Sequence, residues 1–242
     1  MLVSPFIKHS GLTTGILSLV CFSLTANPSQ ATLVDFSSWD KLGDVYTQPG
    51  EASLSNDNAI FQDDAPLGSG FYNLSGNNPE EASPFANLQS FLGLDSTALN
   101  IDAQAFEGSA IKSAITAKAG DIFSFDWRFS TNEFSNKDFG FLVVDNKVVK
   151  LADFTNAILP GTSPGFQKNT GFNTYSYTFN SAGTYKLGFG VVDVGDYVTT
   201  SALDIRNGNI QQVAQEVPEP TTILGSLMAL SYGLLGRFQK KT

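Results

Sequence analysis

The 242-residue chain has 14 basic and 23 acidic residues, but four basic residues and one acidic residue lie in its terminal segments, so residues 32–216 carry a net charge of −12. A region this acidic is repelled by phosphate backbones and anionic lipids, which excludes nucleic acid and peripheral membranes as expected partners and favours cations and neutral polymers. The single cysteine, Cys21, and the single histidine, His9, both precede this region, which excludes disulfides, thiolate nucleophiles, His- or Cys-based metal sites and Ser-His-Asp triads from it.

The first 31 residues have the layout of a cleavable secretory signal peptide. Lys8 is followed by an apolar run over residues 11–24, and a Ser-Gln-Ala triplet then ends at Ala31. We expect signal peptidase to cut after Ala31 and leave Thr32 as the first mature residue. The alternative is a buried N-terminal helix.

Helix is scarce in the next part of the chain. Residues 48–78 are rich in Gly, Asn, Asp and Ser, which predicts long loops with one or two early strands. The segment from Pro84 to Leu94 predicts one short helix, with Ser83 as its N-cap and Gly93 after its end. Its apolar stripe is expected to contain Phe85, Leu88 and Leu92.

From Gly108 onward, short alternating runs are separated by turn residues, which is typical of β-strands. Phe123, Phe125, Trp127 and Phe129 alternate with polar residues and are expected to share one buried face. Two hairpins are expected, one around residues 145–147 and one around residues 181–183. The expected strands are Ser109–Ala117, Ile122–Phe129, Phe139–Val144, Val148–Leu151, Tyr175–Phe179, Tyr185–Val192 and Val198–Ile205.

These strands predict an all-β fold, an antiparallel β-sandwich of jelly-roll type with one short helix, over residues 32–206. Residues 207–216 are polar and Gln-rich, which predicts a linker. Residues 217–242 form a separate C-terminal segment.

The C-terminal segment has a proline-glutamate-proline border, a charge-free stretch over residues 221–236, and a basic end. Sixteen helical residues reach only about 24 Å, so this is a marginal membrane helix. Its basic end is expected to stay in the cytoplasm, with the acidic domain on the far side of the membrane. The border and basic residues are Val217, Pro218, Glu219, Pro220, Arg237, Lys240 and Lys241.

This tail resembles a PEP-CTERM sorting signal in motif, order and position. The resemblance implies recognition by an exosortase, a membrane-embedded processing enzyme, followed by loss of the tail. It also implies transient anchoring in the membrane through this segment alone and then delivery to the cell surface or extracellular matrix. The alternatives are a plain C-terminal transmembrane anchor and a helix of the soluble domain.

A looser resemblance covers the stretches 91–94, 108–111 and 125–133, which are similar to choice-of-anchor domains of bacterial surface proteins. That resemblance implies an adhesin-like or matrix role, and it brings no catalytic residues.

Two acidic groups are candidates for a hard cation such as Ca²⁺, which needs several oxygen ligands and tolerates irregular loops. The alternative is that these carboxylates are solvated or cap turns, since no EF-hand or nonapeptide calcium pattern is present. The first group is Asn132, Glu133 and Asp138, and the second is Asp193, Asp196 and Asp204.

Aromatic residues such as Trp39 and Trp127 would suit a sugar-stacking platform, but a sandwich buries alternate aromatics, so the core is the favoured place for most of them. Tyr175 and Tyr177 share one expected strand face with Phe179. The opposite face carries Thr174, Ser176 and Thr178 and is expected to meet water or a ligand.

The leading expectation is a non-catalytic, exported surface or matrix protein that binds extracellular polysaccharide with the support of calcium. A carbohydrate-active hydrolase is the second hypothesis, because such enzymes use paired carboxylates. Glu107 or Glu133 with an aspartate would qualify, yet carboxylates are so numerous that this pattern discriminates little. A purely structural matrix protein is the third hypothesis.

Overall fold

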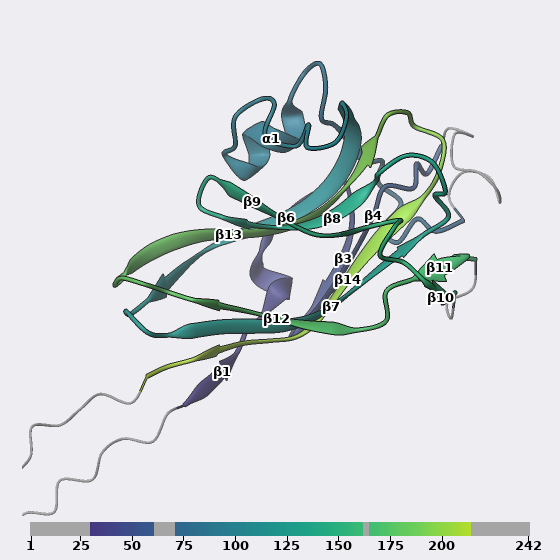
Figure 1. The fold of residues 1–242 in the computed structure, drawn as a ribbon. Coiled ribbons are helices and arrows are strands. Elements are labelled where there is room, and N and C mark those ends of the chain that lie inside the picture. The colour runs from purple at the N-terminus through teal and green to yellow at the C-terminus, as the bar shows by residue number, and fades with distance from the viewer. Residues whose placement is uncertain (1–29, 61–70, 162–164, 214–242) are drawn as a thin grey trace, which may run out of the picture. The chain divides into compact units, whose positions relative to one another are not determined.

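Two antiparallel β-sheets pack against each other in the part of the chain that the computed structural model describes, residues 30–60, 71–161 and 165–213 (Figure 1). This arrangement confirms the predicted all-β sandwich with one short helix. The sorting tail, and the signal peptide up to residue 29, lie outside the described residues. No helix within the described ranges is long and apolar enough to cross a membrane.

Sheet 1 has eight strands, in the order β10-β11-β7-β14-β4-β3, with β1 pairing β14 and β12 pairing β7. Its strands are β1 (Ala31–Leu33), β3 (Asp44–Gln48), β4 (Glu51–Ser55), β7 (Ile122–Thr131), β10 (Leu159–Pro160), β11 (Lys168–Asn169), β12 (Asn173–Thr178) and β14 (Ser201–Gln211).

Sheet 2 has six strands, in the order β2-β6-β13-β8-β9, with β5 pairing β6. Its strands are β2 (Asp40–Leu42), β5 (Glu80–Glu81), β6 (Ala105–Ala117), β8 (Phe139–Val144), β9 (Lys147–Asp153) and β13 (Gly183–Val194). A 3-10 turn, η1 (Phe36–Ser38), precedes β2, and the helix α1 (Asn87–Leu92) precedes β6.

The core between the sheets is aromatic, and Phe189 of β13 lies at its centre. Its ring makes edge-to-face contact with Phe125 of β7, at 4.7 Å between centroids, and with Phe36 of η1 at 5.9 Å. Trp39 stacks on Phe189 at 6.0 Å. Trp39 is buried and Trp127 is packed against the same cluster, which agrees with the expectation that most aromatic residues lie in the core.

The outer face of sheet 2 is covered by α1, which lies over β6 in Figure 1. Leu88 and Leu92 of the helix pack on a second apolar cluster that includes Phe141 and Val143 of β8. Alternate side chains of β8 point to this cluster on one face and to the sandwich core on the other. All six residues of that strand are therefore buried.

The helix is shorter than predicted. It begins at Asn87, its N-cap Ala86 has a left-handed backbone, and no side chain caps it, so Ser83 is not the cap. Phe85, which was expected on the apolar stripe, is 71% exposed. Leu88, Leu92 and the ending at Gly93 agree with the prediction.

One predicted hairpin is wrong. Strands β8 and β9 do form the first hairpin, but β12 pairs with β7 in sheet 1 whereas β13 pairs with β6 and β8 in sheet 2. The connection between β12 and β13 crosses between the sheets at the buried Phe179. Its backbone exchanges hydrogen bonds with Gly120 and Asp121 in the β6–β7 turn.

The last strand extends farther than predicted. β14 continues to Gln211, so residues 207–211, expected to be linker, belong to sheet 1. At its end β14 pairs with β1, where Ala31 is opposite Gln211 and Thr32 is opposite Ile210. The predicted signal-peptidase site therefore lies within β1, whose three residues are all exposed.

Candidate functional site

A cleft of about 330 Å³ opens on the outer face of sheet 1, and the register of three strands builds its floor. Asp204 of β14 is opposite Ser53 of β4 on one side and Arg128 of β7 on the other. Residues directly opposite in an antiparallel sheet share a face. The next outward row along these strands contains the small residues Ser55, Ala202 and Ser130.

Aromatic side chains form the walls of this cleft. Phe71 and Tyr72 come from the loop that precedes β5, and Phe166 comes from the segment that precedes β11. The Tyr72 and Phe166 rings stack at 4.3 Å between centroids, and Phe71 meets Tyr72 edge-to-face at 5.0 Å. Phe71 is 53% exposed, so the rim presents an aromatic surface to solvent.

Buried polar groups hold the Phe71–Tyr72 loop in place. The Asp44 carboxylate accepts hydrogen bonds from the backbone N–H groups of Leu74 and Ser75 at 2.8–2.9 Å. Burial raises the pKa of Asp44 despite these hydrogen bonds and one from Ser55. The backbone N–H of Tyr72 donates to Asp57. These contacts fix the wall before any ligand arrives, which lowers the entropic cost of binding.

The β7–β8 connection supports the same wall. Asn132 donates from Nδ2 to the Tyr72 hydroxyl at 3.0 Å and accepts from the backbone N–H of Gln167 at 2.8 Å. Gly165 has a left-handed backbone at φ +106°, and a Cβ there would lie 2.3 Å from the Tyr72 ring. Glycine is required at this position because it alone allows both the backbone angle and the close approach.

The polar groups of the floor are tied together. Arg128 donates to one Asp204 carboxylate oxygen from Nε at 3.1 Å and from Nη2 at 2.8 Å, while Ser53 donates to the other oxygen at 2.7 Å. The Arg128 and Arg206 guanidinium groups lie 4.8 and 3.5 Å from the Phe172 ring centroid. Phe172 thus packs against Arg128, which lines the cleft, and against Arg206 of β14.

This combination suits a sugar. A pyranose ring has apolar C–H faces, which pack on aromatic rings, and hydroxyl groups, which exchange hydrogen bonds with planar guanidinium and carboxylate groups. Binding sites are typically apolar hollows with a few fixed polar groups. The cleft has three aromatic walls above one Arg–Asp pair and three serines.

The predicted polar face of β12 is confirmed. Thr174, Ser176 and Thr178 are exposed on the outer side of sheet 1, whereas Tyr175 and Tyr177 pack on the core. Thr174 donates to Asp126 of β7 at 2.7 Å. This hydrogen bond, with one from Asn207 and the charge of Arg206, holds the pKa of Asp126 below its usual value.

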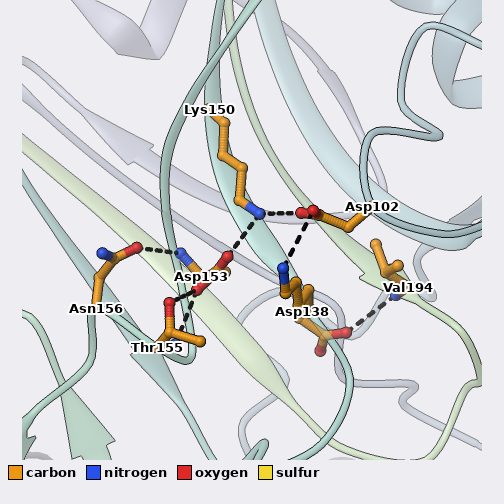
Figure 2. Close-up of polar contacts among 8 residues, drawn as sticks. Asp102, Asp138, Lys150, Asp153, Thr155, Asn156 and Val194 are labelled. Atoms are coloured by element: carbon orange, nitrogen blue, oxygen red, sulfur yellow. Dashed lines mark hydrogen bonds and ion pairs between the residues drawn. The ribbon is translucent and has the colours of Figure 1, made fainter.

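A second polar feature lies at one end of sheet 2, where Asp138 and Asp193 meet. Asp138 precedes β8, and its carboxyl accepts from the backbone N–H of Val194 at 3.0 Å (Figure 2). It also accepts from the Ser201 hydroxyl at 2.9 Å. Ser201 belongs to sheet 1, so Asp138 links the two sheets. Both aspartates are buried, with 0% and 1% of their surfaces exposed.

Burial raises the pKa of Asp138 to about 7, with a further contribution from the negative charge of Glu133. Burial also raises the pKa of Asp193 well above its usual value, and the charges of Asp138, Glu107 and Asp196 act in the same direction. Both groups therefore favour a neutral pair over two buried negative charges.

The structure does not keep the two predicted groups of metal ligands together as predicted, because the pairing of the strands brings members of different groups into contact. Asp138 from the first predicted group lies with Asp193 from the second, and Glu133 and Asp196 act on them electrostatically. Asp204 is separate from them, because β14 places it on the outer face of sheet 1, in contact with Arg128.

The other predicted ligands take part in local hydrogen bonds. Asn136, in the β7–β8 connection, donates to Asp196. In the described part of the chain, no group of three or more Asp, Glu, His or Cys side chains is arranged to hold a metal ion.

The two glutamates considered for hydrolysis do not line the cleft. Glu107 and Glu133 are 7% and 2% exposed. Glu133 accepts hydrogen bonds from the backbone N–H groups of Ser135 and Asn136, so it caps a turn.

Sequence reasoning missed the cleft residues Phe71, Tyr72, Phe166 and Arg128. The available signal was the adjacent aromatic pair Phe71-Tyr72 inside a Gly-, Asn- and Ser-rich stretch. Two large aromatics in such a loop either cover part of the core or form a surface.

No protein-family model matches this sequence, and no curated protein sequence matches it. Among solved structures, the carbohydrate-binding protein TmCBM61 in complex with β-1,4-galactotriose is 10% identical with a TM-score of 0.33, over 74% of this chain and 91% of that one. A β-glucosidase from Kluyveromyces marxianus is 9% identical with a TM-score of 0.30, over 69% of this chain and 18% of that one. At these TM-scores, neither likeness assigns the chain to a family or informs its function.

Proposed function

We propose that this chain is an exported surface or matrix protein that binds a neutral extracellular polysaccharide without hydrolysing it. The observation that carries the proposal is the cleft on sheet 1, where Phe71, Tyr72 and Phe166 stand over the Arg128–Asp204 pair. A neutral ligand fits the charge of −12 on residues 32–216, which repels anionic polymers.

Binding without turnover fits the polar groups of the cleft. Asp204 is the one carboxylate among the described residues that line it, and Arg128 and Ser53 already occupy both of its oxygens. A glycosidase of the usual kind needs two carboxyl groups on either side of the scissile bond. A binding role needs no second carboxylate.

The proposed function is tested by electrophoresis of the full chain through native gels that contain neutral polysaccharides, one per gel. At least one polysaccharide is expected to retard the protein, and soluble oligosaccharides of the same type should restore its migration. No reducing ends should be released. Reducing-end release that is lost in Glu107→Gln or Glu133→Gln would instead establish a hydrolase. Unchanged migration in every gel would favour a purely structural matrix protein.

The route to the surface is a proposal that rests on the terminal motifs. We expect mass spectrometry of the protein from its native producer to show Thr32 as the N-terminal residue and a C-terminus near the Val217–Pro220 border. Signal peptidase and an exosortase-type enzyme would make these two cuts. Intact chains of 242 residues in the cytosol would contradict export and the surface role together.

A further inference from the structure

Acidic residues follow one another across four neighbouring strands at the end of sheet 2. Glu81 of β5 is opposite Glu107 of β6. Asp193 lies in β13 at the irregularity between Val192 and Val194, where β13 pairs with the same part of β6. Asp138 directly precedes β8, whose first residue Phe139 is opposite Val192.

Asp193 is the least satisfied member of this row. It is 1% exposed, and no N–H or O–H group of the described residues donates a hydrogen bond to either of its carboxylate oxygens. The side chain that it meets is the Asp138 carboxyl, which offers a hydrogen only when it is protonated. Burying a carboxylate that no donor compensates is strongly destabilising.

No basic side chain of the described residues compensates the pair. Neither Asp138 nor Asp193 takes part in an ion pair there. Lys137 is adjacent to Asp138 in sequence, but its ammonium group binds Asp102 at 3.3 Å. Lys150 binds Asp102 and Asp153 instead (Figure 2). The described side chains therefore supply no positive partner for this pair, so either a shared proton or a cation from solution must neutralise it.

We propose that Asp138 and Asp193 bind a calcium ion at this end of the sandwich. An ion between the two carboxyl groups would satisfy the donorless oxygens of Asp193 and cancel the repulsion between two buried charges. Asp138 already joins β8 to β14 through Ser201 and to β13 through Val194. The ion would therefore fasten both sheets at one end.

The ligand chemistry favours calcium among the common divalent ions. The candidate ligands are oxygen atoms, and residues 32–216 contain no histidine or cysteine, which disfavours zinc and copper. Two carboxylates supply only part of a shell of six to eight oxygens, and Ca²⁺ completes such a shell with hydroxyl, carbonyl and water oxygens in irregular geometry. One hydroxyl for this shell could come from Thr200, which precedes Ser201 in the chain. Its oxygen is buried and has no hydrogen-bond partner among the residues that the structure describes.

The test compares thermal unfolding of the full chain in EDTA, in calcium and in magnesium, at constant ionic strength and neutral pH. Calcium at about 2 mM is expected to raise Tm by about 5 °C or more over the value in EDTA. Magnesium, which demands tighter octahedral geometry, should raise it much less. Calorimetric titration should give one calcium ion per chain at this site.

Asp193→Asn is the decisive variant, because it keeps the shape of the side chain, removes one buried charge and supplies a donor for Asp138. It is expected to fold, with a Tm in EDTA equal to or above that of the wild type, and to lose the calcium response. Asp95→Asn removes the same charge from an exposed position and should keep it.

Three results would overturn the proposal: no change of Tm with calcium, an equal change with magnesium, or an unchanged calcium response in Asp193→Asn. The first would show that a proton satisfies the pair. Because none of these readouts involves sugar, they do not depend on the polysaccharide proposal.

Discussion

Replacing Phe189 by alanine is expected to lower the free energy of unfolding by about 3–5 kcal/mol, the usual cost of deleting a fully buried phenylalanine ring. The ring is 0% exposed and joins the two sheets, since β13 carries it and Phe123 and Phe125 of β7 surround it from the other side. Phe36 and Trp39 close the remaining sides. Few neighbours can move to fill the cavity, because they are rings held by two different sheets.

Urea unfolding of the full chain, followed by tryptophan fluorescence, measures this loss, and Trp39 is a direct reporter because it stacks on Phe189. Phe134→Ala is the matched control. Phe134 is 72% exposed, so its removal should change stability by less than about 0.5 kcal/mol. A loss below about 1 kcal/mol for Phe189→Ala would mean that the aromatic cluster does not join the sheets.

The sequence predicted the strands whose two faces differ. Strand β7 alternates Phe123, Phe125, Trp127 and Phe129 with polar residues, and these four aromatics do face the core. Such alternation reports which side of a strand is buried, but not which strand lies beside it. That is why β12 and β13 were predicted as a hairpin although they belong to different sheets.

The helix prediction failed at its start for a related reason. Pro84 and Ser83 have the residue types of a helix N-terminus, but the left-handed backbone at Ala86 separates them from α1. Leu88 and Leu92 were correct because burial on sheet 2 decides their position.

The candidate sites depend on register between distant segments, which a sequence does not display. Ser53 and Asp204 are 151 residues apart yet share a hydrogen bond, and Arg128 is 76 residues from Asp204. In the same way, Asp138 and Asp193 were assigned to two different groups, because they meet only through the pairing of β8 with β13. Residue type could predict an acidic, sugar-compatible domain, but only the sheets show which side chains meet.

Phe166→Ala is expected to weaken polysaccharide binding about tenfold, as an increase in Kd. Stacking a sugar face on this ring would remove on the order of 60 Å² of apolar surface from water, worth about 1.5 kcal/mol. The loss of the ring also frees Tyr72, which stacks on it at 4.3 Å. Arg128→Ala should weaken binding as well, because it removes a planar donor and leaves Asp204 without its ion-pair partner.

The measurement is the polysaccharide concentration that halves electrophoretic mobility, determined for each variant in the gel that retards the wild type. Phe85→Ala is the control, because Phe85 is a 71% exposed phenylalanine beside α1, on the side of sheet 2 rather than in the cleft. It should leave retardation unchanged. If Phe85→Ala weakened binding as much as Phe166→Ala, exposed aromatic area in general would hold the polymer. The sheet 1 cleft would then lose its role, because binding by the cleft requires the effect to follow position rather than residue type.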